Sequence, residues 1–229
     1  TEITHVISKV TYPAYSKIQD NLPRLRDAYL KTLKLAAFLS FPIVGLIISL
    51  APDLTIVIFG EKWMPMVPSM QVLVLYGLIE SVAATAGPVF YSLGKPGIDT
   101  MNQLLRVILL MVLIYPLTSK WGLLGTSLAV VITSLAVNIF VLTRFLKVTQ
   151  CMLWRVVRLL LFPSISVFIA FFSMIVIKEN YFPSKGIVEL ITSIIYGTLV
   201  YLGISYFFDK FLRYQIFSTV KDSMALLFK

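Results

Sequence analysis

The sequence predicts an all-α fold: a polytopic transmembrane helix bundle with six spans and the end of a seventh helix. Two observations carry this prediction. Only 14% of the 229 residues are charged and 58% are hydrophobic, whereas a soluble domain carries roughly 25% charged residues. The apolar residues also gather in runs approaching the roughly 20 residues that a membrane-spanning helix needs. A soluble enzyme, a disordered chain and a secreted scaffold held by disulfides are therefore excluded, the last because Cys151 is the single cysteine.

Six apolar runs are the predicted spans. They are continuous, which indicates helices, because the strands of a membrane barrel would alternate apolar and polar residues. The third run is short, so we expect it to start earlier, near Met101, or to be extended by Arg106 reaching toward the interface. The runs cover residues 33–59, 69–93, 104–117, 122–143, 159–177 and 187–208.

Two segments precede the first span. Residues 6–18 are half apolar and are interpreted as the cytoplasmic end of a helix whose upper part is missing. Asp20 or Asn21 can cap the next helix and Pro23 lies in its first turn, which predicts a short basic helix leading into the membrane. The chain opens on Thr1 without a signal sequence, so we expect it to be part of a longer protein.

The basic residues predict the orientation. Of the 20 Lys and Arg residues, 16 fall on one side of the six spans, and the opposite side holds only Lys62, Lys120, Lys178 and Lys185. Because Lys and Arg accumulate in cytoplasmic loops, both ends of the chain are predicted to be cytoplasmic. The net charge of +9 is then a sign of topology and of contact with membrane lipids, and nucleic acid is not an expected partner.

Polar side chains within the spans are the candidate site residues. Glu80 lies about 16 Å along a helix from Ser69, near the bilayer middle, where a charge costs at least ~2.5 kcal/mol. Arg106 is its nearest plausible counter-ion. Glu80 could line a polar cavity and relay a proton or contact substrate, or it could form a structural ion pair, and the sequence leaves both open. Weaker candidates for the same substrate or proton pathway are Asn102, Gln103, Asn138 and Gln71.

Prolines and small residues predict how the helices bend and touch. A proline inside a helix removes a backbone hydrogen bond and kinks or breaks the helix, and small residues let helices approach closely. Prolines lie in or at the ends of most spans, including Pro42 beside Gly45, Pro52, and Pro88 beside Gly87; small residues expected at helix contacts include Gly77, Gly125, Ala129 and Thr133.

The sequence contains no recognisable catalytic pattern. His5 is the single histidine and lies outside the spans. The sequence therefore lacks the residues needed for pairs of acid–base histidines or for histidine-rich metal sites. A phosphate-binding glycine loop and a nucleophile elbow are also absent. We therefore predict a protein that is not an enzyme and that needs neither a cofactor nor a metal.

Several motifs resemble a known family. They are KVTYPAYSKIQ at 9–19, FGEKWMPMVP at 59–68, YSLGKP at 91–96 and YPLTSKWGLLG at 115–125. With the long block at 7–73, these are similar to the polysaccharide and O-antigen flippases, in the lipopolysaccharide and colanic-acid exporter branch of the multidrug, oligosaccharidyl-lipid and polysaccharide exporter superfamily. The resemblance covers about the first 145 residues well.

The resemblance implies one lobe of a two-lobe exporter in the bacterial cytoplasmic (inner) membrane. Such proteins move undecaprenyl-linked oligosaccharide to the outer leaflet by alternating access. This chain would be most of the carboxyl-terminal lobe, with the amino-terminal half of the same protein as its partner. The implied division is 1–34, a helix end and basic connector; 35–143, a four-span core; and 144–229, an amphipathic connector, two further spans and a cytoplasmic tail.

Three alternatives remain open from the sequence. A proton- or sodium-coupled multidrug antiporter of the same superfamily would use Glu80 as its coupling site. A membrane-embedded glycan polymerase or ligase would need a large outer loop, and the longest here is only residues 178–186. A membrane scaffold is the third alternative.

Overall fold

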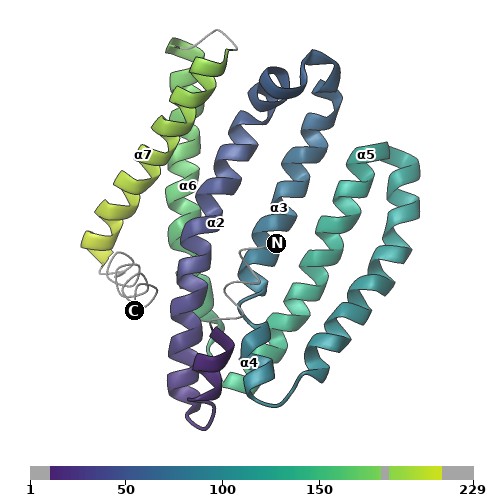
Figure 1. The fold of residues 1–229 in the computed structure, drawn as a ribbon, viewed down its shortest axis with the longest axis vertical. Coiled ribbons are helices and arrows are strands. Elements are labelled where there is room, and N and C mark those ends of the chain that lie inside the picture. The colour runs from purple at the N-terminus through teal and green to yellow at the C-terminus, as the bar shows by residue number, and fades with distance from the viewer. Residues whose placement is uncertain (1–10, 182–185, 213–229) are drawn as a thin grey trace.

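The structure is a computed structural model that describes residues 11–181 and 186–212, and this part of the chain is helical without any β-strand. Figure 1 shows the helices side by side, running up and down along one direction. Residues 11–16 form the end of a first helix. The elements that follow are α2 (Leu22–Phe59), the 3-10 helix η1 (Glu61–Met66), α3 (Val67–Ala83), α4 (Gly87–Ser92), α5 (Gly97–Thr149), α6 (Leu153–Tyr181) and α7 (Ile187–Leu212).

Helix α2 begins where the sequence predicts a cap. The side chain of Asn21 accepts a hydrogen bond from the backbone N–H of Arg24 at 3.1 Å, and Pro23 lies in the first turn. The short basic helix and the first span were predicted as separate segments, but they form one continuous helix of 38 residues. No glycine or proline interrupts the stretch between Leu25 and Phe41, so the basic segment leads into the first span without a break.

The 53 residues of α5 form a helical hairpin rather than one rod. A straight helix of that length would measure about 80 Å, far more than the ~30 Å of a bilayer core. Gly122 adopts φ 56° and ψ −131°, a conformation that glycine adopts readily, and there the chain turns back. The hydroxyls of Thr118 and Thr126 hydrogen bond across the turn at 2.9 Å. The third and fourth predicted spans are therefore the two arms of α5, the first at residues 97–121 and the second at residues 123–149, and Figure 1 shows both.

Two predicted spans differ in detail from the structure. The second span is interrupted between α3 and α4, where residues 84–86 form a turn immediately before Gly87 and Pro88. The third span begins at Gly97 rather than near Met101 or Leu104, because the helix starts directly after the turn at Gly94–Pro96. Arg106 consequently lies about 14 Å along α5, deeper than its predicted place at the start of the span.

Helix α2 is the central element of the bundle. Its first half packs with α4, the second arm of α5 and the start of α6 in the largest apolar core. In this core the ring centroids of Tyr29 and Phe145 are 4.0 Å apart. Its second half packs against α6 and α7 through two smaller apolar clusters. Small residues were expected at helix contacts. Gly125 meets this expectation, because it lies against the backbone of Leu117. Gly77 does not, because a Cβ atom added to it would have no neighbour within 4 Å.

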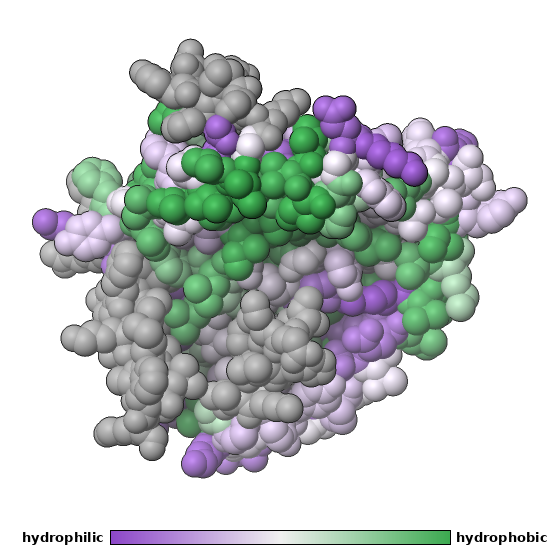
Figure 2. Space-filling view, turned by 45° about the horizontal axis from the view of Figure 1, so that its top comes forward, coloured by the Kyte–Doolittle hydropathy of each residue, from purple (hydrophilic) through white to green (hydrophobic). Residues whose placement is uncertain are grey.

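The surface matches a membrane environment. Five helical segments are long and apolar enough to cross a bilayer, and one of them is the α5 hairpin with two arms. Large apolar side chains such as Tyr115, Met111 and Phe168 are more than 70% exposed, and Figure 2 shows broad hydrophobic areas on the visible face. This is a multi-pass membrane protein.

Basic residues gather at one end of the bundle. The beginning of α2, the end of α5 and the beginning of α6 meet there in the apolar core, at the bottom of Figure 1. Asp27 lies 4.0 Å from Arg26 and 3.8 Å from Arg155; the side chains of Asp27 and Arg155 are exposed, whereas that of Arg26 is partly buried. The segment predicted as an amphipathic connector comprises the end of α5 and the start of α6, while the predicted tail beyond residue 212 and residues 1–10 lie outside the described residues.

Candidate functional site

The strongest polar cluster within the spans is centred on Glu80 of α3. Both terminal nitrogens of Arg106 donate to its carboxylate, Nη1 to Oε2 at 3.0 Å and Nη2 to Oε1 at 2.8 Å. Bidentate pairs of this kind are stronger and more directional than single ion pairs. The structure thus places Arg106 against Glu80, as expected for its counter-ion. The two side chains are only 24% and 19% exposed, so water replaces few of their contacts.

The second arm of α5 supplies two further donors. The hydroxyl of Ser134 donates to Oε1 of Glu80 at 2.7 Å, and Nδ2 of Asn138 donates to the same oxygen at 3.1 Å. Nδ2 of Asn138 also lies 3.1 Å from the Ser134 hydroxyl. Ser134 and Asn138 are four residues apart and therefore share one face of the helix. Sequence reasoning selected Asn138 and missed Ser134, although the i, i+4 spacing of two polar residues in an apolar helix was a usable signal.

The geometry limits what Glu80 can do chemically. Its Oε1 accepts three hydrogen bonds and its Oε2 accepts one, close to the roughly four that a carboxylate accommodates. The charge is also balanced by Arg106. A further ligand of Glu80 would have to displace one of these donors, because the carboxylate has little remaining hydrogen-bonding capacity. In this conformation the cluster joins three helical segments: α3 and both arms of α5.

Asn102 lies one helical turn before Arg106 and is 4% exposed. Its Oδ1 and the Nε of Arg106 are buried without a hydrogen-bond partner among the described residues, as is the hydroxyl of Thr133 beside Ser134. Buried polar atoms of this kind are ordinarily satisfied, often by ordered water. Asn102 therefore adds unused polar capacity on the same arm of α5 as Arg106.

The remaining two predicted residues are elsewhere. Gln103 is exposed, so it lies on a different face of α5 from the buried Asn102. Gln71 is on α3, but its Nε2 donates to the backbone carbonyl of Ile48 in α2 at 2.9 Å. Its contact is with the α2 backbone, so the structure does not bring Gln71 into the Glu80 cluster.

An apolar groove of about 320 Å³ adjoins the cluster. It is lined by α2, α3, the second arm of α5 and α6, with Tyr29, Val82 and Phe145 among its walls. Asn138 also lines it and contacts Glu80, so the groove and the polar cluster share this residue. Across residues 11–181 and 186–212 the side chains form no cluster of three His, Cys, Asp or Glu that could hold a metal ion.

Comparison with known sequences finds similarity to a polysaccharide biosynthesis family and to individual membrane and biosynthesis proteins. A family described as "Polysaccharide biosynthesis protein" matches residues 1–68. The chain is 32% identical over 133 residues to an uncharacterized membrane protein in the cps region of Klebsiella pneumoniae, covering 58% of this chain and 27% of that protein. It is 33% identical over 87 residues to the lipopolysaccharide biosynthesis protein WzxC of Escherichia coli (strain K12), covering 38% of this chain and 18% of that protein.

A third relative comes from Bacillus subtilis. The chain is 27% identical over 94 residues to the teichuronic acid biosynthesis protein TuaB of Bacillus subtilis (strain 168), covering 41% of this chain and 20% of that protein. The chain therefore spans about a quarter or less of the length of the curated relatives it matches.

The fold has a solved counterpart. The lipid II flippase MurJ, in an inward closed conformation, superposes with a TM-score of 0.73 at 17% sequence identity. The match covers 90% of this chain and 43% of that structure. At that identity it establishes a shared fold. The resemblance that the motifs predicted is confirmed: this chain is similar in sequence to proteins of polysaccharide biosynthesis, and 90% of it shares the fold of 43% of the lipid II flippase structure.

Proposed function

We propose that this chain is the carboxyl-terminal lobe of a flippase that moves lipid-linked oligosaccharide across the bacterial cytoplasmic membrane. The observation that carries the proposal is the match of 90% of the chain to 43% of the lipid II flippase structure. The relatives support it, because their names place them in lipopolysaccharide and teichuronic acid biosynthesis. The expected substrate is an undecaprenyl-linked sugar, and the amino-terminal half of the same protein would supply the facing lobe.

The proposed work is physical rather than covalent. A flippase shelters a polar headgroup while the lipid tail stays in the bilayer, so it needs polar side chains at membrane depth and an apolar exterior. The chain offers both, with Glu80, Arg106 and Asn138 inside the spans and large apolar side chains outside. We place these three residues on the polar pathway, and Asn102 beside them because of its unused buried oxygen.

The geometry of Glu80 favours the flippase over the antiporter alternative. A proton-coupled antiporter needs a carboxylate that gains and loses a proton during the cycle. Here the carboxylate of Glu80 already accepts four hydrogen bonds, two of them from the guanidinium of Arg106, so its oxygens are engaged in contacts within the lobe. The proposed role of the pair is to keep a polar, electrically neutral surface within the lobe.

The test is reconstitution of the full-length protein in vesicles containing a fluorescent undecaprenyl-linked oligosaccharide. A membrane-impermeant quencher reaches only the outer leaflet, so flipping increases the quenched fraction from about half toward complete. Vesicles without protein are the control. Quenching that stays at half for the full-length protein would contradict the proposal. Extrusion of a cationic dye that is abolished by Glu80→Gln, without any flipping, would support the antiporter instead.

A further inference from the structure

Two prolines lie inside α2, and each leaves one backbone carbonyl without its helical donor. Proline has no N–H, so Pro42 cannot bond the carbonyl of Phe38 and Pro52 cannot bond the carbonyl of Ile48. Unsatisfied carbonyls are costly where water is scarce, and in membrane helices neighbouring side chains commonly take the place of the missing donor.

Each freed carbonyl is bonded by a side chain from another helix. The hydroxyl of Tyr201 in α7 donates to the carbonyl of Phe38 at 2.9 Å. Nε2 of Gln71 in α3 donates to the carbonyl of Ile48, also at 2.9 Å. Helices α3 and α7 lie on opposite sides of α2 (Figure 1). The two proline sites of one helix are therefore held from two different parts of the bundle.

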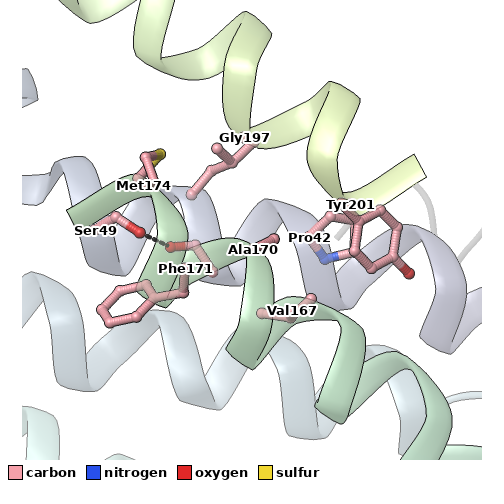
Figure 3. A pocket seen from close by; sticks show the side chains of 10 residues that line it. Pro42, Ser49, Val167, Ala170, Phe171, Met174, Gly197 and Tyr201 are labelled. Atoms are coloured by element: carbon pink, nitrogen blue, oxygen red, sulfur yellow. Dashed lines mark hydrogen bonds between the residues drawn. The ribbon is translucent and has the colours of Figure 1, made fainter. Parts of the chain in front are cut away.

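The site at Pro42 is also closely packed, as Figure 3 shows for the side chains of α2, α6 and α7. A Cβ built on Gly45 would lie 2.6 Å from Val167 of α6, and one built on Gly197 would lie 2.8 Å from Leu46. The space left between these helices is a crevice of only about 20 Å³. Helices α6 and α7 fit here because α2 has its present shape and because both glycines lack a side chain.

Tyr201 makes a second contact with the same residue of α2. Its ring packs against the ring of Phe38 with centroids 5.5 Å apart, and Tyr201 is 2% exposed. The ring contact orients the tyrosine, and the hydroxyl then meets the carbonyl. Removing the hydroxyl alone would keep the packing and remove this hydrogen bond to the carbonyl of Phe38.

We propose that Tyr201 and Gln71 are positioning residues that fix the shape of α2 at its two prolines, so that the α6–α7 hairpin controls the bend at Pro42 while α3 controls the bend at Pro52. A displacement of α7 that breaks the Tyr201 contact allows the part of α2 after Pro42 to move relative to the part before it. These two hydrogen bonds to α2 couple α6 and α7 to the rest of the lobe, and the coupling does not depend on which substrate the protein carries.

The first test is hydrogen–deuterium exchange of the full-length protein in lipid nanodiscs. In Tyr201→Phe, amides of residues 38–45 are expected to exchange about 5- to 10-fold faster, as loss of one hydrogen bond predicts, while residues 48–56 remain unchanged. Gln71→Met should give the reverse pattern, so the two variants are matched to each other. Tyr196→Phe, another α7 tyrosine, should change neither segment. Equal acceleration in both segments with Tyr201→Phe would overturn the proposal, because it would indicate general destabilisation.

A second measurement reports the bend itself. Spin labels at positions 31 and 58, both exposed on α2, would be about 40 Å apart on a straight helix. In a Cys151→Ser background, Tyr201→Phe should broaden the distance distribution and Tyr196→Phe should leave it unchanged. A distribution for Tyr201→Phe that superimposes on that of the parent protein would overturn the coupling of α7 to α2.

Discussion

Arg106 and Glu80 form a bidentate ion pair within the membrane-spanning part of the bundle, with both terminal nitrogens of the guanidinium within 3.0 Å of the two carboxylate oxygens. The pair joins the first arm of α5 to α3, and Ser134 extends it to the second arm. A charge in this environment is tolerated because its partner and its hydrogen bonds are supplied together.

Breaking this pair is expected to destabilise the protein. Arg106→Leu leaves the carboxylate of Glu80 without its charge partner and should cost about 2–3 kcal/mol, somewhat less than a fully buried pair because both side chains are partly exposed. The double variant Arg106→Leu with Glu80→Gln should recover part of the loss, since no uncompensated charge remains. Equilibrium unfolding of the full-length protein in mixed micelles measures both. Gln103→Leu, at an exposed neighbouring position, is the control and should have little effect. An Arg106→Leu variant as stable as the parent would refute the role assigned to the pair.

Gly125 is expected to be essential for the α5 hairpin. A methyl group there would overlap the backbone carbonyl of Leu117, and backbone cannot yield unless the hairpin opens. Gly125→Ala should therefore cost more than the about 1–3 kcal/mol that overpacking usually costs. The loss of folded protein would be measured by gel filtration. Gly77→Ala is the matched control, because its methyl meets nothing within 4 Å and alanine favours a helix by about 0.5–1 kcal/mol. Normal folding of Gly125→Ala would show that the hairpin is looser than the structure indicates.

Cys151, between α5 and α6, is expected to react slowly with maleimide at neutral pH. Burial raises the pKa of its thiol above the ordinary value, and the nearby charges of Arg26 and Arg155 only partly oppose this. Because the thiolate is the reactive form, the rate should keep rising at pH values above the ordinary thiol pKa of about 8.5. The same shift means that the neutral thiol contributes stability below the unfolded pKa of about 8.5, and this contribution is lost as the pH rises through the folded pKa.

The control for this prediction uses the adjacent exposed position. Met152 is 72% exposed, so Met152→Cys in a Cys151→Ser background should react faster and reach its plateau rate at a lower pH. If Cys151 and this control show the same pH midpoint, the burial of Cys151 does not govern its chemistry.

The basic end of the bundle is expected to face the cytoplasm. In a Cys151→Ser background, Lys120→Cys at the tip of the α5 hairpin should be labelled in intact cells by a membrane-impermeant maleimide. Met152→Cys, at the opposite end, should be labelled only after the membrane is permeabilised. Both positions are exposed, so access and not burial decides the outcome. The inverse labelling pattern would reverse the orientation that the positive-inside rule predicts.

Much of the candidate site was predictable and part of it was not. A charged residue in an apolar run is visible in a sequence, so Glu80 and Arg106 stand out without a structure. Their contact was an expectation, since a sequence does not specify how two helices are rotated against each other. Ser134 was missed because a serine in a membrane helix most often bonds its own backbone, and only the packing of α5 against α3 turns it toward Glu80.

Gln71 shows what the sequence could not specify. It was one of the weaker candidates for the substrate or proton pathway, and in the structure its amide bonds the carbonyl of Ile48 that Pro52 leaves free. The sequence contains both Pro52 and Gln71, but their relation spans two helices and depends on how α2 and α3 are aligned.

The membrane as solvent, the class of fold, the number of spans and the predicted orientation follow from the sequence alone, because they depend on composition and on charges counted along the chain. The sequence also determined where α2 begins, since Asn21 and Pro23 act locally. The tertiary structure decided what local rules leave open: that Gly122 folds α5 into two arms, that Arg106 meets Glu80, and that Tyr201 bonds the carbonyl of Phe38. Those contacts join segments 26 and 163 residues apart, and only the packing of whole helices brings such distant residues together.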